Sequence, residues 1–485
     1  DAAVVSPRKG AAVTASRALA ALVVAGLALS SSIASGQNID RAKRPAIGAQ
    51  PTFKFPKMET HTLANGLRLV VVEDHALSLV AARIVLGADS TADPPGREGL
   101  YAVTLGALRE GTTSMTPGQL ADAFADVGTT VGPIGFTTTT PGFARGLALV
   151  GDMLMHPRLD QAGIDRRKAA QSAAARRLVQ TPITLPRHLF YARLYGVNDP
   201  YVRSLVPTEA TIASITRDDV THFYEQHIRP NTTTIVLVGD VRDDAALAQV
   251  TRVFGGWPAR SAPVRSDSAT TTPARPTTIY LSDVPGTQAY LYIGNAGPAR
   301  TSPDLYAVET AAAVSGIRMQ QSLREKRSFM YSGATGMIWR RAPAPSAYVG
   351  STSVNAAKVD SALVEWLALL RGLRGDRVAT AAELDAVRRN RIGALPARID
   401  GPDSIAARVV EMIRDRLPLD YFDEYATRMA RVAPSDVARA ASKYIDLDHL
   451  IIVVTGDRAT IEPALRAARI APVVVVDANG KPIDP

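Results

Sequence analysis

An arginine and a tyrosine are the side chains best suited to act on a bound molecule. Arg324 and Tyr331 lie seven positions apart in the segment SLREKRSFMYSGATG. A guanidinium and a phenol both donate hydrogen bonds to oxygen, and neither needs a neighbouring base to do so. The spacing alone also fits a solvated helix residue and a half-buried strand residue. Because Arg324 begins the sequence REKR, next to a predicted helix and a predicted strand, we favour a functional pair.

Other residues that commonly carry chemistry are scarce or scattered. The chain has seven histidines and no cysteine, which excludes disulfides, thiol nucleophiles and zinc sites built on thiolates. His222 and His227 are five apart and do not share a helix face, so a two-histidine metal site is not expected. The remaining histidines are isolated in the sequence and fit surface or packing roles. They are His61, His75, His156, His188 and His449.

The segment EGLYAVTLGALREGT, Glu98 to Thr112, predicts an amphipathic core helix. It also resembles the signature of the pitrilysin/insulinase-type (inverted zincin) metallopeptidase family, which reads roughly G-L-x-H-x-x-E-H-x-x-x-x-G-T. In that family two histidines on one helix face bind zinc, and the glutamate between them activates the metal-bound water. Here Gly99-Leu100 and Gly111-Thr112 match the two ends of the signature.

The centre of the signature does not match. The first histidine falls on Ala102, the glutamate on Leu105 and the second histidine on Gly106, and none of these can bind a metal or move a proton. The family's remaining ligand is a glutamate further downstream, yet the chain has no glutamate between Glu110 and Glu209. The resemblance therefore implies no catalytic residue and no metal site in this chain.

Three further segments carry the same resemblance: HTLANGLRLVVVEDH, LALVGDMLMHPRLD and Ser214 to Val241. The segment around Arg324 and Tyr331 resembles the family's L-R-E-K-R-G-L-A-Y-S element. In active members this pair reaches the substrate from the C-terminal half and hydrogen-bonds it near the scissile carbonyl. The residues before it, Ala312 to Gly316, are expected to form a loop that lacks the glycines often found there in the family.

The order of predicted elements repeats once along the chain. Asp219-Val220 precedes Val238-Gly239-Asp240 by the interval that separates Asp436-Val437 from Thr455-Gly456-Asp457, and each interval holds a helix and a β-branched strand. Coincidence between two common helix-strand units is the alternative. The resemblance implies an α+β fold of two homologous domains, each an antiparallel sheet with helices mainly on one face, together forming half of a clamshell.

Composition shifts suggest where these domains begin and end. Residues 56–257 are predicted to form an N-terminal peptidase-like domain with the degenerate metal motif. Residues 258–276, rich in proline, serine and threonine, read as a linker. Residues 277–485 then form the C-terminal peptidase-like domain that holds the Arg/Tyr pair.

The first 36 residues have the layout of a secretory signal peptide. Basic residues up to Arg17 precede the apolar stretch Ala18 to Leu29, and small residues follow. Residues 37–55 are a polar lead-in. We expect export, to the periplasm, although an uncleaved membrane anchor would look similar. The net charge of +9 is spread over the chain without the clustered footprint of a nucleic-acid binder, so no nucleic-acid partner is expected.

The leading hypothesis is a non-catalytic, substrate-binding subunit of an exported heterodimeric zinc metallopeptidase. Its partner would be a homologous subunit with the HxxEH motif, which would supply the zinc, while Arg324 and Tyr331 hold the peptide substrate. The chain would be inactive on its own. The alternative is a scaffold or binding protein of the same fold with no role in proteolysis. An enzyme with relocated ligands is disfavoured because no clustered His, Asp and Glu set exists.

Overall fold

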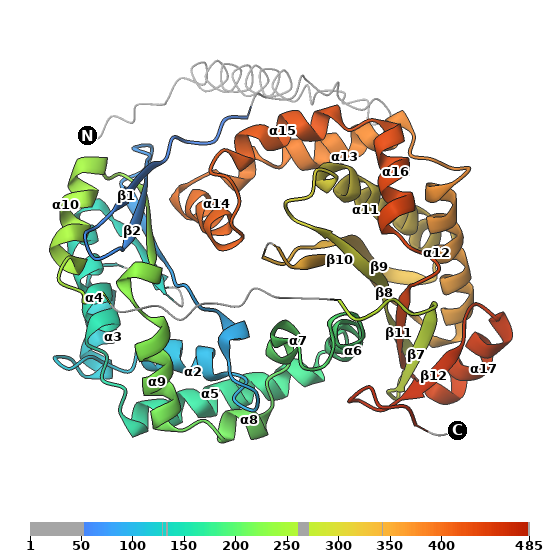
Figure 1. The fold of residues 1–485 in the computed structure, drawn as a ribbon, viewed down its shortest axis with the longest axis horizontal. Coiled ribbons are helices and arrows are strands. Elements are labelled where there is room, and N and C mark those ends of the chain that lie inside the picture. Colours follow the sequence, from blue (N-terminus) through green and yellow to red (C-terminus); the bar gives the residue numbers. More distant parts are fainter. Residues whose placement is uncertain (1–52, 129, 132–133, 260–270, 342, 484–485) are drawn as a thin grey trace, which may run out of the picture. The chain divides into compact units, whose positions relative to one another are not determined.

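A computed structural model describes residues 53–128, 130–131, 134–259, 271–341 and 343–483 (Figure 1). Residues from Pro51 onward form one compact unit. The predicted signal peptide, most of the polar lead-in and residues 260–270 of the predicted linker lie outside the described residues. In the part of the chain that the structure describes, no helix is both long and apolar enough to cross a membrane.

In the described residues, two six-stranded sheets form the framework, and the first has the strand order β1-β2-β6-β3-β5-β4. All its strands come from the N-terminal half of the chain. They are β1 (Glu59–Thr62), β2 (Arg68–Glu73), β3 (Leu79–Val85), β4 (Thr130–Val131), β5 (Gly135–Thr139) and β6 (Thr234–Gly239).

The second sheet has the order β12-β7-β11-β8-β10-β9 and comes from the C-terminal half. Its strands are β7 (Thr278–Asp283), β8 (Gln288–Ala299), β9 (Met330–Ile338), β10 (Pro345–Asn355), β11 (Ile451–Gly456) and β12 (Val473–Val476). From its second strand onward the order repeats that of the first sheet, with β7, β11, β8, β10 and β9 in the places of β2, β6, β3, β5 and β4. The predicted duplication is confirmed.

The expected antiparallel pairing needs one correction. Most neighbours are antiparallel, but β2 pairs with β6, and β7 with β11 and β12, in parallel. Parallel neighbours cannot be joined by a tight turn and need a long connection. The helical segments between the paired strands provide that connection. Each sheet is therefore mixed.

Helices connect the strands in both halves. Those of the N-terminal half are α2 (Leu100–Ala107), α3 (Pro117–Asp126), α4 (Phe143–Met155), α5 (Gln161–Gln180), α6 (Thr184–Tyr195), α7 (Pro200–Leu205), α8 (Glu209–Ala213), α9 (Arg217–His227) and α10 (Asp243–Phe254). Those of the C-terminal half are α11 (Leu305–Met319), α12 (Val359–Arg374), α13 (Ala381–Gly393), α14 (Pro402–Arg414), α15 (Tyr421–Arg431), α16 (Pro434–Tyr444) and α17 (Arg458–Ala468). A π-helical turn, η4 (Gln320–Lys326), follows α11 directly.

Local sequence signals explain a hairpin and a helix end in the N-terminal half. β1 and β2 form an antiparallel hairpin around Asn65-Gly66, and Gly66 has φ +84°. Glycine tolerates this left-handed conformation without a steric cost. Thr116 caps α3 in a reciprocal capping box with Gln119, and Gly128 follows the helix with φ +63°. Both elements follow from these local signals.

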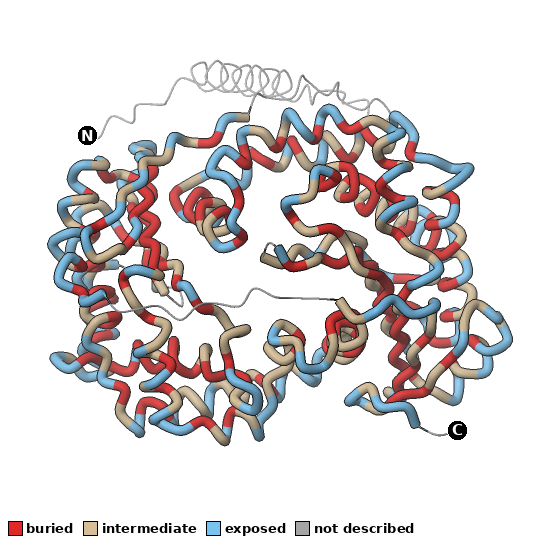
Figure 2. The backbone as a smooth tube through the Cα atoms, viewed as in Figure 1, coloured by how far each residue is buried: buried red, intermediate tan, exposed pale blue. Residues whose placement is uncertain are grey.

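Each sheet is buried on both faces, which Figure 2 shows as continuous red along the central strands. One face packs against helices of the same half of the chain, in clusters centred on residues such as Leu69 and Leu147 in the first sheet and Leu291 and Trp366 in the second. All six residues of β6 are buried. A strand buried on both faces needs a second covering layer, which its own half does not supply.

That second layer comes from the other half of the chain. The outer face of the first sheet, including Val70 and Val236, packs with Ile405 and Val409 of α14. The outer face of the second sheet packs with α6 and α7, where Phe190 contacts the ring of Tyr292 with centroids 5.0 Å apart. The exchange is symmetric, because α14 lies on β3 and β6 while α6 lies on the equivalent strands β8 and β11.

Removing one buried side chain from α14 tests this exchange. Ile405 is 2% exposed and contacts the first sheet's outer face. Ile405→Ala should lower the free energy of unfolding by about 2–5 kcal/mol, and amide hydrogen exchange should quicken in β3 and β6. Val364→Ala, at a 49% exposed site, is the control and should change stability by about 0.5 kcal/mol or less. Unchanged exchange in β3 and β6 would refute the coupling.

Candidate functional site

Arg324 and Tyr331 lie on either side of a helix-to-strand junction. α11 runs into η4 without a break, and Arg324 lies in the last turn of η4. The expected loop over Ala312 to Gly316 is wrong, because these residues are helical and lie inside α11. The alanines favour helix, and the Gly316 site lacks space for a side chain, since an added Cβ would lie 2.7 Å from Thr335 Oγ1.

The two side chains meet at the surface. The Arg324 guanidinium carbon lies 5.9 Å from the centre of the Tyr331 ring, within cation–π range, and Tyr331 is 81% exposed. Their sequence neighbours Leu323 and Met330 are buried in the core, which turns the pair outward. Among the described residues, neither side chain of the pair has a hydrogen-bonding or ionic partner. Both can therefore donate to another molecule.

The neighbouring basic residue is engaged differently. Arg327 forms a 3.6 Å ion pair with Glu365 of α12, and Glu365 also accepts a hydrogen bond from Ser322 Oγ at 2.5 Å. These contacts attach η4 to α12. They leave Arg324 as the cation on this turn that stacks on Tyr331.

The turn between the pair places a serine in a left-handed conformation. Ser328 has φ +53°, and the Phe329 amide donates to the Leu323 carbonyl at 2.7 Å across it, a helix-ending pattern that favours glycine. Ser328 stands where the family's L-R-E-K-R-G-L-A-Y-S element has glycine. The resulting backbone path sets the direction in which β9 leaves the helix.

The helix that resembles the metal signature is a packing element. Leu105 is 8% exposed and belongs to the core of the N-terminal half. Gly106 faces α5, and a Cβ added there would lie 2.7 Å from Cδ of Arg167. The Arg167 side chain therefore occupies the space that a side chain at position 106 would need.

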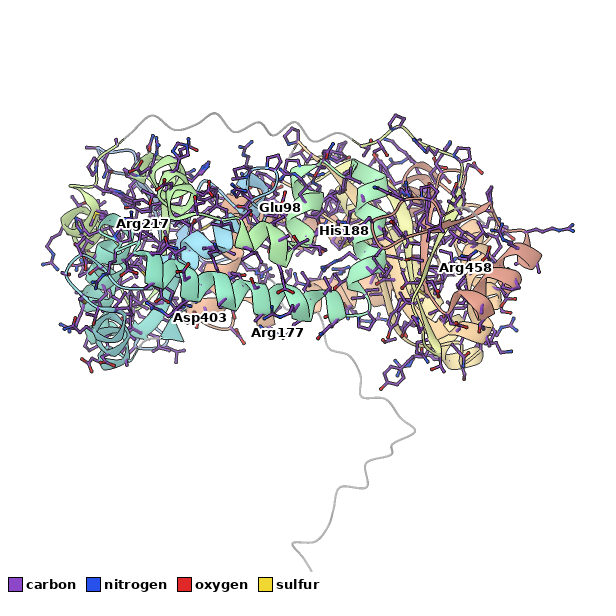
Figure 3. The ribbon with its side chains drawn as sticks, turned by 90° about the horizontal axis from the view of Figure 1, so that it is seen from below. Glu98, Arg177, His188, Arg217, Asp403 and Arg458 are labelled. Atoms are coloured by element: carbon purple, nitrogen blue, oxygen red, sulfur yellow. The ribbon has the colours of Figure 1, made fainter. Side chains whose placement is uncertain are left out.

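Arg167 is held there by a buried carboxylate. Glu110 is 3% exposed and pairs with Arg167 and, at 2.6 Å, with Arg166. Removing one partner of such a buried pair leaves an uncompensated charge and is costly. Figure 3 looks onto α5, which carries both arginines, with Arg177 labelled near its C-terminal end. The sequence did not reveal this network, because Glu110 and the two arginines are more than 50 positions apart.

The glycines at both ends of the signature are retained because the backbone there has positive φ angles. Gly99 and Gly111 have φ +103° and +102°, and a Cβ at Gly111 would lie 2.6 Å from the Met115 carbonyl oxygen. Asp93 accepts hydrogen bonds from the amides of Gly99 and Tyr101 at 2.8 and 2.7 Å. Burial raises the pKa of Asp93 to about 6 despite these two hydrogen bonds.

Zinc does not fit the residues at the motif positions. Ala102, Leu105 and Gly106 offer no ligand atoms, and Glu110 is already paired with two arginines. Across the described residues, no three His, Asp or Glu side chains come together in a way that could hold a metal ion. Zinc prefers three or four nitrogen, sulfur or carboxylate ligands.

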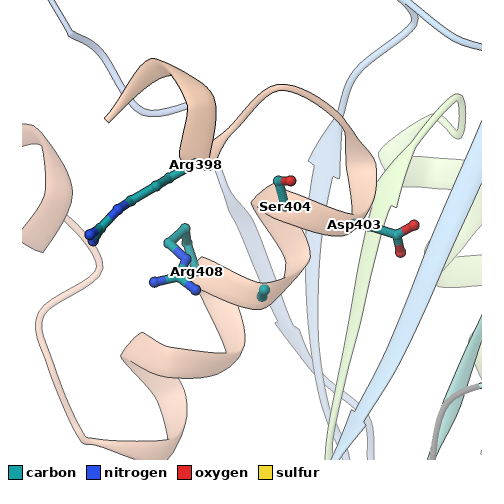
Figure 4. A pocket seen from close by; sticks show the side chains of 5 residues that line it. Arg398, Asp403, Ser404 and Arg408 are labelled. Atoms are coloured by element: carbon teal, nitrogen blue, oxygen red, sulfur yellow. The ribbon is translucent and has the colours of Figure 1, made fainter. Parts of the chain in front are cut away.

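A separate open pocket lies beside α14. Arg398, Ser404, Ala407 and Arg408 line it together with Asp403, and Figure 4 shows the two arginines on one side and Asp403 pointing the other way. Asp403 pairs with Arg83 of β3, so this carboxylate serves the contact between the two halves. The pocket contains none of the predicted site residues.

Comparison with known proteins gives a family match over part of the chain. Residues 214–391 match the model of the Peptidase M16 inactive domain. An uncharacterized zinc protease of Bacillus subtilis, YmxG, is 21% identical over 211 residues, which are 42% of this chain. The chain spans about half the length of that curated relative, 51%.

Solved structures share the fold. The peptidase M16 inactive domain from Pseudomonas fluorescens superposes with a TM-score of 0.75 at 22% identity, covering 82% of this chain and 98% of that one. A protease from Helicobacter pylori gives 0.74 at 17% identity, with 82% and 99% covered. The periplasmic protease PqqL from Escherichia coli gives 0.68 at 14% identity, with 87% of this chain and 51% of PqqL covered.

Two mixed sheets, a motif helix without ligands and these shared folds define a peptidase-like protein of the inactive type. Residues 214–391 match the inactive domain of the M16 peptidases, which confirms the predicted resemblance to the pitrilysin/insulinase-type family.

Restoring the motif residues alone should not restore a metal site. In the variant Ala102→His, Leu105→Glu and Gly106→His, the glutamate at position 105 is buried in the core and the histidine at position 106 collides with Arg167. We expect purified protein without bound zinc and an unfolding free energy lower by about 3–5 kcal/mol. Metal analysis after dialysis and denaturant unfolding measure both, and stoichiometric zinc would show that α2 can still form a site.

The conformation of Ser328 predicts opposite effects for the same substitution at two nearby serines. Ser328→Gly should stabilise the chain by about 0.5–1 kcal/mol, because glycine adopts φ +53° without strain. Ser332→Gly, in strand β9, should destabilise it by a similar amount because glycine is unfavourable in strands. Denaturant midpoints report both. A destabilised Ser328→Gly variant would contradict the strain argument.

Proposed function

We propose that this chain is the non-catalytic, substrate-binding subunit of a heterodimeric zinc metallopeptidase. The observation that carries the proposal is a contrast within one chain. The motif helix has lost its ligands and filled their space with Arg167, whereas Arg324 and Tyr331 stay exposed and side by side. A pair of donors without an internal role is what a site completed by a partner would retain.

The chemistry of the pair fits binding of a peptide carbonyl. A guanidinium and a phenol present N–H and O–H donors, and such donors stabilise an oxygen on which negative charge develops. Neither group can activate water or hold a metal, so both tasks fall to the partner. The partner would be a homologous subunit with the HxxEH motif, carrying the zinc.

Export is part of the same proposal. It is supported by the signal-like layout of residues 1–36 and by the likeness to PqqL, a periplasmic protease. The assembly would then act on peptides in the periplasm.

The test is to combine the chain with an HxxEH homologue and assay cleavage of an unstructured peptide. The wild-type pair should form a zinc-containing active heterodimer, and Arg324→Ala with Tyr331→Phe should lower kcat/KM by about 10²–10³-fold, because oxygen-binding donors are lost. Lys326→Ala, on the same turn, is the control and should retain activity. Size measurement should show that every variant still associates.

Two outcomes would refute the proposal. If no homologue associates with the chain, the heterodimer falls. If the double variant associates and is fully active, the pair has no role in proteolysis and the chain is a scaffold of the same fold.

A further inference from the structure

The turn that carries Arg324 has an unusual hydrogen-bond pattern. In η4 the Arg327 amide donates to the Ser322 carbonyl at 3.0 Å, five residues back instead of the four of an α-helix. The additional residue in the turn changes the side of the helix that each residue faces. Such π-helical turns are rare and occur frequently at functional sites. The contacts that hold this turn therefore set the direction of Arg324.

A single carboxylate holds both residues of this π-helical hydrogen bond. Glu365 of α12 accepts from Ser322 Oγ at 2.5 Å through one oxygen, and its other oxygen lies 3.6 Å from a guanidinium nitrogen of Arg327. Ser322 is buried, whereas the Arg327 side chain is exposed. A hydrogen bond to an ionised acceptor is stronger than a neutral one, and a long, exposed ion pair contributes little. The Ser322 contact is therefore the main attachment of the turn to α12.

Arg324 lies between the two attached residues. Its neighbour Leu323 is fully buried, and its carbonyl accepts from the Ser328 amide at 3.2 Å. These contacts fix the backbone of Arg324. Among the described residues, the guanidinium itself contacts the Tyr331 ring, 5.9 Å from its centre, and has no hydrogen-bonding partner. The position of the guanidinium therefore depends mainly on where η4 places the backbone.

Tyr331 is held by a different set of contacts. The preceding residue, Met330, is buried and pairs with β10. The following residue, Ser332, accepts a hydrogen bond at its carbonyl from Thr352 Oγ1 of β10 at 2.9 Å. None of these contacts involves Glu365. A change at Glu365 should therefore move the guanidinium and leave the Tyr331 ring in place.

We propose that Glu365 is a positioning residue, which fixes Arg324 against Tyr331 by holding the π-helical turn on α12. It acts through Ser322 and Arg327 and touches no substrate. The inference deepens the proposed function, on which the expected effect on peptide cleavage rests. A donor aimed at a carbonyl oxygen is sensitive to a displacement of about 1 Å, so the support of the turn should matter for the reaction.

The chain alone provides the first test. Glu365→Ala should quicken hydrogen exchange of the Arg327 amide by about tenfold or more. With arginine-selective labelling, the NMR ring-current shift of the Arg324 side chain should be lost, and Tyr331→Leu gives the reference value without a ring. Glu365→Gln keeps an oxygen that can accept from Ser322 Oγ and should preserve both signals. Unchanged exchange and an unchanged ring-current shift in Glu365→Ala would overturn the inference.

Leu373→Ala is the matched control for a general loss of stability. Leu373 is fully buried in α12, about two turns beyond Glu365. Its truncation should lower the denaturant midpoint at least as much as Glu365→Ala does, because it leaves a cavity in the core. The Arg327 amide exchange and the Arg324 ring-current shift should nevertheless match those of wild type.

The active heterodimer provides the second test. Glu365→Ala should lower kcat/KM by about tenfold or more, but by less than about twofold when Arg324 is already alanine. Two changes that act through one side chain are not additive, whereas a loss of stability would lower activity in both backgrounds. Glu365→Gln should lower kcat/KM by only about threefold, because the contact with Ser322 is kept. An equal loss in both backgrounds would refute the positioning role.

The two proposals can fail separately. If the chain forms no active heterodimer, or if Arg324→Ala leaves cleavage unchanged, the proposed function falls, and the two signals in the chain alone still decide whether Glu365 places Arg324. If the heterodimer is active and sensitive to Arg324 but not to Glu365, the positioning inference falls alone.

Discussion

Each sheet of this protein has two apolar faces, and its own half of the chain covers only one of them. The uncovered face of the first sheet takes α14, and that of the second takes α6, so each half completes the core of the other. This exchange explains why β6 is buried along its whole length. It also fixes the end of β9, because Arg340 reaches Asp199 and two tyrosines in the segment that includes α6 and α7. The far end of β9 therefore depends on packing between distant parts of the sequence.

The motif helix keeps the glycines at the two ends of the signature but has no metal ligands between them. Gly99 and Gly111 remain because their backbone angles suit glycine, whatever the helix between them does. In the family, the residues at the three motif positions between them serve zinc binding and catalysis. In this chain, where they are Ala102, Leu105 and Gly106, these positions serve packing instead. Leu105 joined the core, and Gly106 admits Arg167, whose charge is balanced by Glu110. Restoring the ligands would therefore be costly, because a side chain at position 106 would disturb the ion pair between Arg167 and the buried Glu110.

Sequence patterns predicted the parts of the fold that local chemistry determines. The Asn65-Gly66 hairpin, the Thr116 cap and the repeated helix-strand unit depend on neighbouring residues, so they were predictable. Ala312 to Gly316 was misjudged as a loop because the family comparison outweighed the helix preference of its alanines. The covering role of α14 and the contact of Arg167 with Gly106 could not be predicted, because both depend on residues that meet only after folding. The left-handed Ser328 had a signal, the glycine of the family element, although serine itself gives none.

The groups around the exposed pair, Arg324 and Tyr331, mostly serve the fold. Leu323 and Met330 are buried, Arg327 is paired and Gln320 caps a carbonyl of β9, so nearly every neighbouring group serves the fold. A tyrosine that is 81% exposed gains little from burial, and its contact with Arg324 across 5.9 Å contributes roughly 0.5–1 kcal/mol at such a site. Stability therefore gives little reason for this arrangement. The outward position of these two donors is instead what the proposed function requires, because it leaves both free to contact a bound peptide.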